Sequence, residues 1–161
     1  FLRASPLVGF GWSWGACRLL AALAAAPALA ARFSHLVLVS PTLHFADTPA
    51  RGETVASMLR ALPRHPEAVL AAFRRRLTRR TELADKLCRL PPPGPVAGMT
   101  ADLEGLRDFR AVLPPLYLPT LLVHGGQDEI IPPEHAAGFS AAFRNLEVHL
   151  FADAGHVPFL E

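Results

Sequence analysis

The chain carries the pentapeptide Gly11-Trp12-Ser13-Trp14-Gly15, a G-x-S-x-G pattern that constrains the fold more than any other feature. The apolar run Leu7-Val8-Gly9-Phe10 precedes this pattern, and a long Ala/Leu-rich segment follows it. This order predicts a strand, a sharp turn and a helix, with the serine at the apex of the turn. Such a turn strains the serine backbone, and the flanking glycines avoid a Cβ that would crowd the neighbouring strand or helix. The serine hydroxyl is therefore expected to stand clear of the carboxyl end of a strand.

A serine hydroxyl is a weak nucleophile at neutral pH unless a base takes its proton and a third group orients that base. The chain supplies both groups in the order serine, acid, histidine. Asp128 follows the apolar run at 120–124, and His156 follows the alternating run at 146–151. Because active groups gather at the carboxyl ends of parallel strands, we expect Ser13, Asp128 and His156 to converge.

Other acidic and histidine residues compete for these roles. Glu129 neighbours Asp128 but points away if Asp128 points inward, and Asp153 is expected in a solvated turn. The remaining histidines are expected at the surface or as satisfied strand residues: His35, His44, His65, His124, His135 and His149. The sharp turn at Ser13 is called the elbow. Among the histidines, His44 follows the strand that comes after the helix at this elbow, and it could line a pocket. No group of residues has a metal-ligand spacing, so we predict no metal and no cofactor.

The composition is typical of a globular protein, with 51% hydrophobic and 19% charged residues among 161. Cys17 and Cys88 are far apart and lack a CxxC pattern, which predicts free thiols and a reducing, cytoplasmic compartment. The apolar run at 19–31 is short and interrupted by Pro27, so we predict a buried helix and no membrane span. The chain opens without Met, a charged segment or a cleavage site, and we expect a fragment of a longer protein with no signal peptide.

The pattern of elements divides the chain into three predicted regions. Residues 1–40 are expected to form one part of the sheet core with the serine turn, and the apolar run at 36–39 is expected to be a parallel strand covered on both faces. Residues 41–99 are expected to form a helical cap with proline punctuation, and residues 100–161 return to the core with the acid and the histidine. We therefore predict an α/β fold in which an all-helical insert covers the site.

These motifs resemble the α/β-hydrolase superfamily, whose acid follows the penultimate strand and whose histidine follows the last strand. Within the superfamily the chain is similar to the carboxylesterases of biotin synthesis, which demethylate pimeloyl-acyl-carrier-protein methyl ester. Besides the elbow, the stretches that carry this likeness are 69–73, 103–110, 118–132 and 154–159. The resemblance implies the C-terminal half of a parallel α/β-hydrolase sheet with a helical cap insert.

The resemblance also implies a role for each site residue. Ser13 would be the nucleophile of a serine carboxylesterase, Asp128 the acid and His156 the base. The backbone N–H of Trp14 would donate to the oxyanion, and Trp12 would contact the substrate. Enzymes of this family have an N-terminal half with further strands and a second oxyanion donor, and we do not find that half in these 161 residues.

A basic segment points to the kind of partner. Between residues 60 and 89, nine basic and three acidic residues give a net charge of +6, in a chain whose net charge is +2. We expect Arg75, Arg76, Arg79 and Arg80 to dock an acyl-ester substrate carried on an acidic acyl carrier protein, although a solvated helix face is the other interpretation. No aromatic residues accompany these arginines in a nucleic-acid-binding pattern, so we predict no nucleic-acid partner.

Three other functions stay open at this point. A general short-chain esterase, or a C–C hydrolase or lyase, would keep the serine, acid and histidine on the same scaffold and change the cap. A non-catalytic, hydrolase-like binding module would usually lack one of the three residues, and this chain has all of them.

Overall fold

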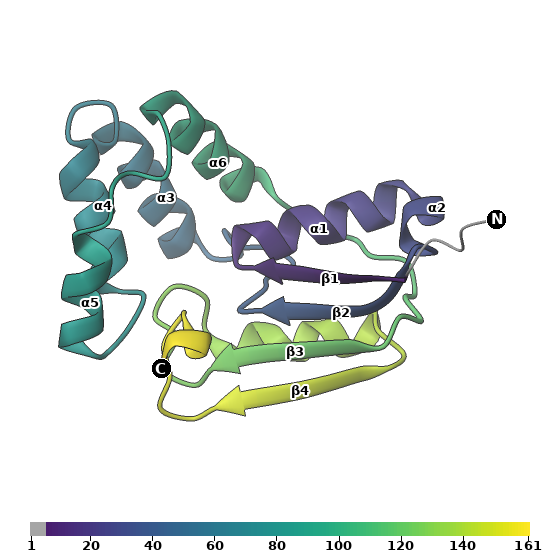
Figure 1. Cartoon of the computed structure of the whole chain (residues 1–161). Helices are drawn as coiled ribbons and strands as arrows, with labels where there is room; N and C mark the ends of the chain where they lie inside the picture. Colours follow the sequence, from purple (N-terminus) through teal and green to yellow (C-terminus); the bar gives the residue numbers. More distant parts are fainter. Residues whose placement is uncertain (1–5) are drawn as a thin grey trace.

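The computed structural model describes residues 6–161, and its centre is a four-stranded parallel sheet in the order β1-β2-β3-β4 (Figure 1). The strands are Leu7–Trp12 (β1), Phe33–Val39 (β2), Thr120–Gly125 (β3) and Leu146–Phe151 (β4). Every neighbouring pair is parallel, so each connection must cross over from one end of the sheet to the other. The predicted α/β fold is confirmed.

The main core lies on one face of this sheet. Leu36 and Leu38 alternate along β2 and therefore point to the same face, where both are buried. There they join one cluster with Leu20 of α1 (Trp14–Ala25) and Phe139 of η1 (Pro133–Ala141). Fully burying a side chain of this kind stabilises the fold by about 1.5–3 kcal/mol. This cluster fixes the two helices against the strands that carry the site.

The opposite face of the sheet is much less covered. Val8 and Phe10 of β1 are 62% and 63% exposed, and Val37 of β2 is only half-buried. On that face of β2, Val39 is buried at 3% exposed, whereas Val37 is half-buried. The expectation that β2 is covered on both faces is therefore confirmed only at the carboxyl end of the strand.

The connections follow the proline pattern. Helix α1 ends at Ala25, and Pro27 opens a separate short helix, α2 (Pro27–Ala30), before the chain enters β2. The interruption predicted at Pro27 is thus where the first helix ends. The segment after the loop that carries Asp128 forms η1, a 3₁₀ helix that is wound more tightly than an α-helix. None of the helices in residues 6–161 is long and apolar enough to cross a membrane.

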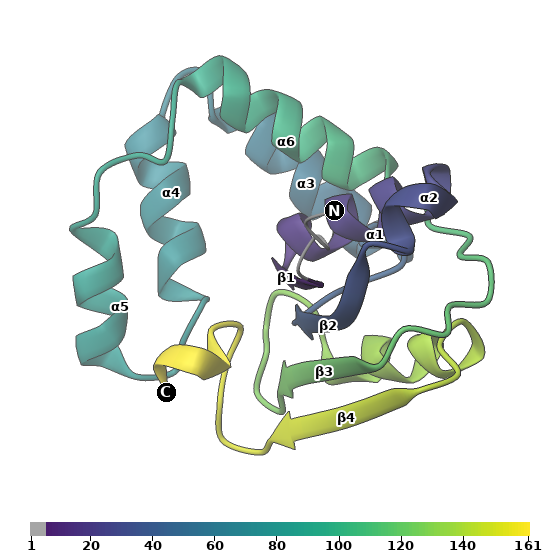
Figure 2. The ribbon, with the colours of Figure 1, turned by 45° about the vertical axis from the view of Figure 1, so that its right-hand side comes forward.

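Four helices form a cap beyond the carboxyl ends of the strands (Figures 1 and 2). They are α3 (Pro49–Ala61), α4 (Pro66–Arg75), α5 (Thr81–Cys88) and α6 (Val96–Asp108). Prolines at the first turns of α3 and α4 lack an N–H where none is needed, and Thr48 caps α3 by accepting from the Arg51 N–H. The boundary predicted between residues 99 and 100 falls inside α6, which packs on α3 as part of the cap.

Candidate active site

Ser13 occupies the turn between β1 and α1 with φ 52° and ψ −124°. A positive φ is rare for a residue with a side chain and signals backbone strain. The tight turn needs Gly11, because a Cβ there would lie 2.5 Å from the Ala16 Cα atom. Gly15 is different from what we expected, since a Cβ at that position would meet nothing within 4 Å. Packing therefore explains the first glycine of the pattern but not the second.

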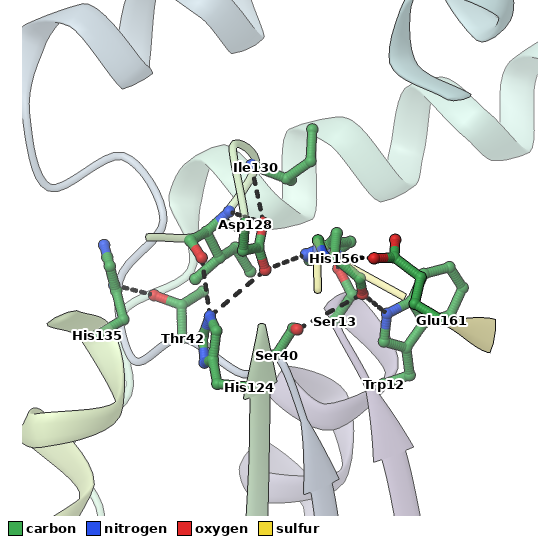
Figure 3. A network of polar contacts seen from close by, with 12 residues as sticks. Trp12, Ser13, Ser40, Thr42, His124, Asp128, Ile130, His135, His156 and Glu161 are labelled. Atoms are coloured by element: carbon green, nitrogen blue, oxygen red, sulfur yellow. Dashed lines mark hydrogen bonds and ion pairs between the residues drawn. The ribbon is translucent and has the colours of Figure 1, made fainter. Parts of the chain in front are cut away.

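Ser13, His156 and Asp128 form a chain of hydrogen bonds (Figure 3). The Ser13 Oγ atom is 2.8 Å from His156 Nε2, and His156 Nδ1 is 2.7 Å from Asp128 Oδ2. His156 is fully buried and Asp128 is 5% exposed, whereas Ser13 is half-buried. The most accessible member of the chain is thus the hydroxyl that the sequence predicts to be the nucleophile.

Both oxygens of Asp128 are engaged. Oδ1 accepts the N–H groups of Ile130 and Ile131 at 2.8 and 2.9 Å, which leaves Oδ2 facing the histidine. Burial by itself raises the pKa of Asp128, but its contacts with His124, with His156 and with a loop N–H outweigh burial and hold that pKa well below the usual range. The carboxylate is therefore charged at neutral pH and fixed in direction.

The backbone of His156 is held by the core and by the cap. Its N–H donates to Leu77 O, just after α4, at 2.8 Å. Its carbonyl accepts from Trp12 Nε1 at 2.9 Å, and Ser40 Oγ lies 3.5 Å from the same oxygen. Ser40 itself has a positive φ of 44°, directly after β2. The position of this histidine therefore depends on β1, on the end of β2 and on the cap.

Trp12 is placed differently from the sequence prediction, which put it against the substrate. Its ring centroid lies 5.7 Å from that of His156 and 5.6 Å from that of Phe159. Trp12 is not among the described residues that line the cavity at the site. Its side chain supports the histidine loop, because the indole N–H reaches the His156 carbonyl.

Trp14 begins α1 directly after Ser13, so its N–H is one of the first helical donors, which have no acceptor within the helix. The predicted oxyanion donor is thus at a suitable place. The indole ring of Trp14 contacts α6, where a Cβ on Gly105 would lie 2.7 Å from the ring. Trp14 Nε1 also donates to Asp102 Oδ1 at 3.0 Å. This side chain joins the elbow to the last cap helix.

A mainly apolar cavity of about 260 Å³ lies between the elbow and the cap, with Ser13 and Trp14 in its wall. Most of its lining is aliphatic, aromatic or thioether: Phe45, Val55, Met58, Leu62, Val69, Leu70, Phe73, Met99, Leu103, Leu106 and Ile130. Charged side chains are few: Arg51, Arg76, Asp102 and Glu129. His44 is not among the lining residues, so the idea that it lines the pocket has no support here. The cavity suits an apolar chain beside the Ser13 hydroxyl.

The four predicted docking arginines are all exposed but fall into two pairs. Arg76 donates to the Glu129 carbonyl at 2.8 Å, and Arg79 contacts the Glu129 carboxylate at 2.6 Å. Both therefore tie the cap to the acid loop. Arg75 and Arg80 make no ion pair within residues 6–161, so their charges remain available to solvent.

His124 is the residue that the sequence reasoning missed. It is fully buried at the end of β3, and Nε2 lies 2.8 Å from Ile131 O and 3.4 Å from Asp128 Oδ2. The signal that could have found it is its position four residues before Asp128, with two glycines between them.

Within the part of the chain that the structure describes, no group of three or more His, Cys, Asp or Glu side chains could hold a metal ion. Cys17 and Cys88 are both free, as the sequence predicts.

Comparison with known proteins places this geometry in a family. The profile of the alpha/beta hydrolase family matches residues 1–161. A pimeloyl-[acyl-carrier protein] methyl ester esterase from Nitrosospira multiformis is 42% identical over 53 residues, which are 33% of this chain and 20% of that protein.

Two solved esterases have a similar structure. An esterase from Exiguobacterium antarcticum has 21% identity and a TM-score of 0.80, over 94% of this chain and 60% of that one. A thermophilic esterase from Thermogutta terrifontis has 24% identity and a TM-score of 0.78, over 97% of this chain and 60% of that one.

The chain thus spans about 60% of the length of these solved structures and a fifth of the curated relative. At such identities the solved structures show the fold. The family profile extends over the full sequence, and the fold and the strand–elbow–helix unit agree with it. The chain therefore belongs to the alpha/beta hydrolase family.

Proposed function

We propose that the protein is a serine carboxylesterase, a carboxylic ester hydrolase with Ser13 as nucleophile, His156 as base and Asp128 as acid. The observation that carries this proposal is the continuous contact from Ser13 Oγ through the imidazole to Asp128 Oδ2, at 2.8 and 2.7 Å. These are hydrogen-bond distances within the range that proton transfer requires.

The proposed reaction has two steps. As Ser13 Oγ attacks the ester carbonyl, His156 Nε2 takes the hydroxyl proton, and the charged Asp128 stabilises the imidazolium that forms. The Trp14 N–H donates to the developing oxyanion. The imidazolium then protonates the departing alcohol. In the second step Nε2 takes a proton from the water that attacks the acyl-enzyme and gives it to Ser13 Oγ as the acid leaves.

The test is hydrolysis of p-nitrophenyl esters by the full-length gene product. We expect Ser13→Ala to abolish turnover, because the chain of contacts then has no nucleophile at its end. Ser140→Ala is the matched control, since Ser140 is exposed on η1 and should leave the rate unchanged. Undiminished hydrolysis by Ser13→Ala would exclude this serine as the nucleophile.

We further propose that the substrate is an acyl methyl ester carried on an acyl carrier protein, as in pimeloyl-acyl-carrier-protein methyl ester of cytoplasmic biotin synthesis. Two observations support this finer assignment. One is the local identity to a curated esterase with that substrate in its name. The other is the solvent-facing pair Arg75 and Arg80 beside the cap, which suits an acidic carrier.

The docking test replaces only two of the four arginines. Arg76 and Arg79 hold Glu129 next to the acid, so their replacement would also disturb the site. Arg75→Glu with Arg80→Glu should raise KM for an acyl-carrier-protein ester roughly three- to tenfold, because each exposed ion pair contributes about 0.2–1 kcal/mol. We expect kcat and the small p-nitrophenyl ester to be unaffected, and the KM effect to shrink as salt rises.

Arg144→Glu is the control for this test, since Arg144 is exposed between η1 and β4, before the amino end of β4, whereas the cap lies beyond the carboxyl ends of the strands (Figure 1). An equal loss on both substrates would indicate damage to the fold. Unchanged KM in the double variant would leave the general esterase as the better assignment. Restored growth of a biotin-requiring mutant that lacks the demethylating esterase would favour the carrier-protein substrate over a C–C hydrolase or lyase.

A further inference from the structure

Two buried histidines face the same oxygen of the acid. His156 Nδ1 is 2.7 Å from Asp128 Oδ2, and His124 Nε2 is 3.4 Å from it (Figure 3). Both rings are fully buried, and Asp128 is nearly so. The proposed mechanism uses only His156, so the second ring needs an explanation of its own.

The surroundings of His124 determine which of its nitrogens carries the proton. Nε2 faces two acceptors, Ile131 O at 2.8 Å and the Asp128 carboxylate. Nδ1 is buried and has no hydrogen-bond partner among the described residues. A proton on Nδ1 would be an unsatisfied buried donor, whereas a proton on Nε2 is donated to Ile131 O at 2.8 Å, with Asp128 Oδ2 3.4 Å from the same nitrogen. These surroundings therefore favour a proton on Nε2 over one on Nδ1.

His124 also acts on the other oxygen of the carboxylate, through the loop. It binds the carbonyl of Ile131, and the N–H of Ile131 donates to Asp128 Oδ1 at 2.9 Å. One imidazole thus contacts the acid on both sides: its Nε2 lies 3.4 Å from Oδ2, and its bond to the Ile131 carbonyl holds the loop that donates to Oδ1.

The loop between His124 and Asp128 has little room to change its conformation. A Cβ on Gly125 would lie 1.9 Å from Gly155 O, and one on Gly126 would lie 2.7 Å from Ala152 O. The acid loop is therefore packed backbone against backbone on the loop that leads to His156. The two loops therefore fix where Asp128 and His156 meet, and even a small rotation of the Asp128 carboxylate would displace the hydrogen bond that orients His156.

We propose that His124 is a positioning residue for the acid, which holds the Asp128 carboxylate aimed at His156 through its Nε2–H group at the end of β3. The inference rests on the proposed esterase function, since it assigns His124 a part in the same reaction. His124 does not touch the substrate, because it lies behind the acid and outside the cavity lining.

The test compares two replacements in the full-length protein. His124→Leu fills similar space without a donor, and His124→Gln places an amide N–H at about the reach of Nε2. We expect His124→Leu to lower kcat for a p-nitrophenyl ester roughly 10- to 100-fold with KM unchanged, as for loss of a hydrogen bond to a charged group. His124→Gln should recover most of that loss. His149→Leu, on the exposed edge strand β4, is the matched control and should match the wild type.

A second measurement does not depend on activity. Nitrogen-15 NMR of the histidine rings should show His124 protonated at Nε2 and not at Nδ1 at neutral pH. A proton on Nδ1, or a kcat of His124→Leu equal to that of the wild type, would overturn the inference. So would a kcat loss in His124→Gln as large as that in His124→Leu, if thermal unfolding shows both variants to be folded.

The two proposals fail in distinguishable ways. If the wild type does not hydrolyse esters, the proposed function is wrong, whatever His124 does. If the wild type is active, Ser13→Ala is inactive and His124→Leu is unaffected, only the positioning role is wrong.

Discussion

Replacement of Asp128 by asparagine should invert the hydrogen bonding of the site while leaving its shape unchanged. Two backbone N–H groups face Oδ1, so the amide oxygen of asparagine must take that place. The amide NH₂ then occupies the Oδ2 position, 2.7 Å from His156 Nδ1. Because that nitrogen must now accept, the ring proton moves to Nε2, and Nε2 can no longer take the proton of Ser13. A flipped amide is no better, since its NH₂ would face two backbone donors.

The size of this effect follows from the tautomer. In other triads the wrong histidine tautomer lowers kcat roughly 10⁴-fold, which corresponds to about 5 kcal/mol of transition-state stabilisation. Steady-state hydrolysis of a p-nitrophenyl ester should therefore show a fall of this order in kcat with little change in KM. Asp153→Asn, at an exposed turn three residues before His156, should be nearly silent. A variant Asp128→Asn that kept more than about a tenth of the wild-type kcat would refute the tautomer argument.

Two further expectations concern groups in or behind the site. Burial raises the pKa of the Cys17 thiol to about 11, whereas the Cys88 side chain is half-buried. A thiol reagent should therefore label Cys88 before Cys17 in the native protein, and equal labelling rates would contradict this expectation. The pKa of Asp128 lies below its unfolded value of about 3.9, so the stability that this group contributes is present above that pH and lost as pH falls through the folded value. Urea unfolding at decreasing pH should therefore show the wild type losing stability more steeply below about pH 4 than Asp128→Asn, and parallel curves would argue against the shift.

The parts of the fold that the sequence predicts are those set by local patterns. The elbow can be predicted because a strand, two glycines and a helix lie within a few residues of Ser13. The convergence of three residues, Ser13, Asp128 and His156, can be predicted because each follows a strand, and parallel strands end at the same edge of the sheet. The position of each residue just after a strand can be predicted from its neighbours in the sequence, although the residues that then meet are far apart along the chain.

The parts that the sequence does not reveal depend on contacts across the chain. Trp12 supports His156 through a hydrogen bond that spans 144 positions, and no local pattern distinguishes that role from contact with substrate. Arg79 and Glu129 are 50 positions apart, so a run of arginines cannot show which of its members are paired. The need for glycine at position 105 is visible only in the structure, where the ring of Trp14 lies against it.

His124 illustrates the same limit at short range. Its spacing from Asp128 is visible in the sequence, but an i, i+4 pair at the end of a strand does not by itself predict contact. The two glycines between them allow a tight return of the chain, and only the structure shows that this return brings Nε2 to 3.4 Å from the carboxylate.

The most direct measurement of the central claim is the site of covalent modification by a fluorophosphonate probe, located by peptide mapping of the full-length protein. The probe reacts with a serine that a base activates, so we expect one adduct, on Ser13, and none in the Ser13→Ala variant. An adduct on another serine, or ester hydrolysis by a protein whose Ser13 stays unmodified and dispensable, would contradict the assignment of the nucleophile and the mechanism built on it.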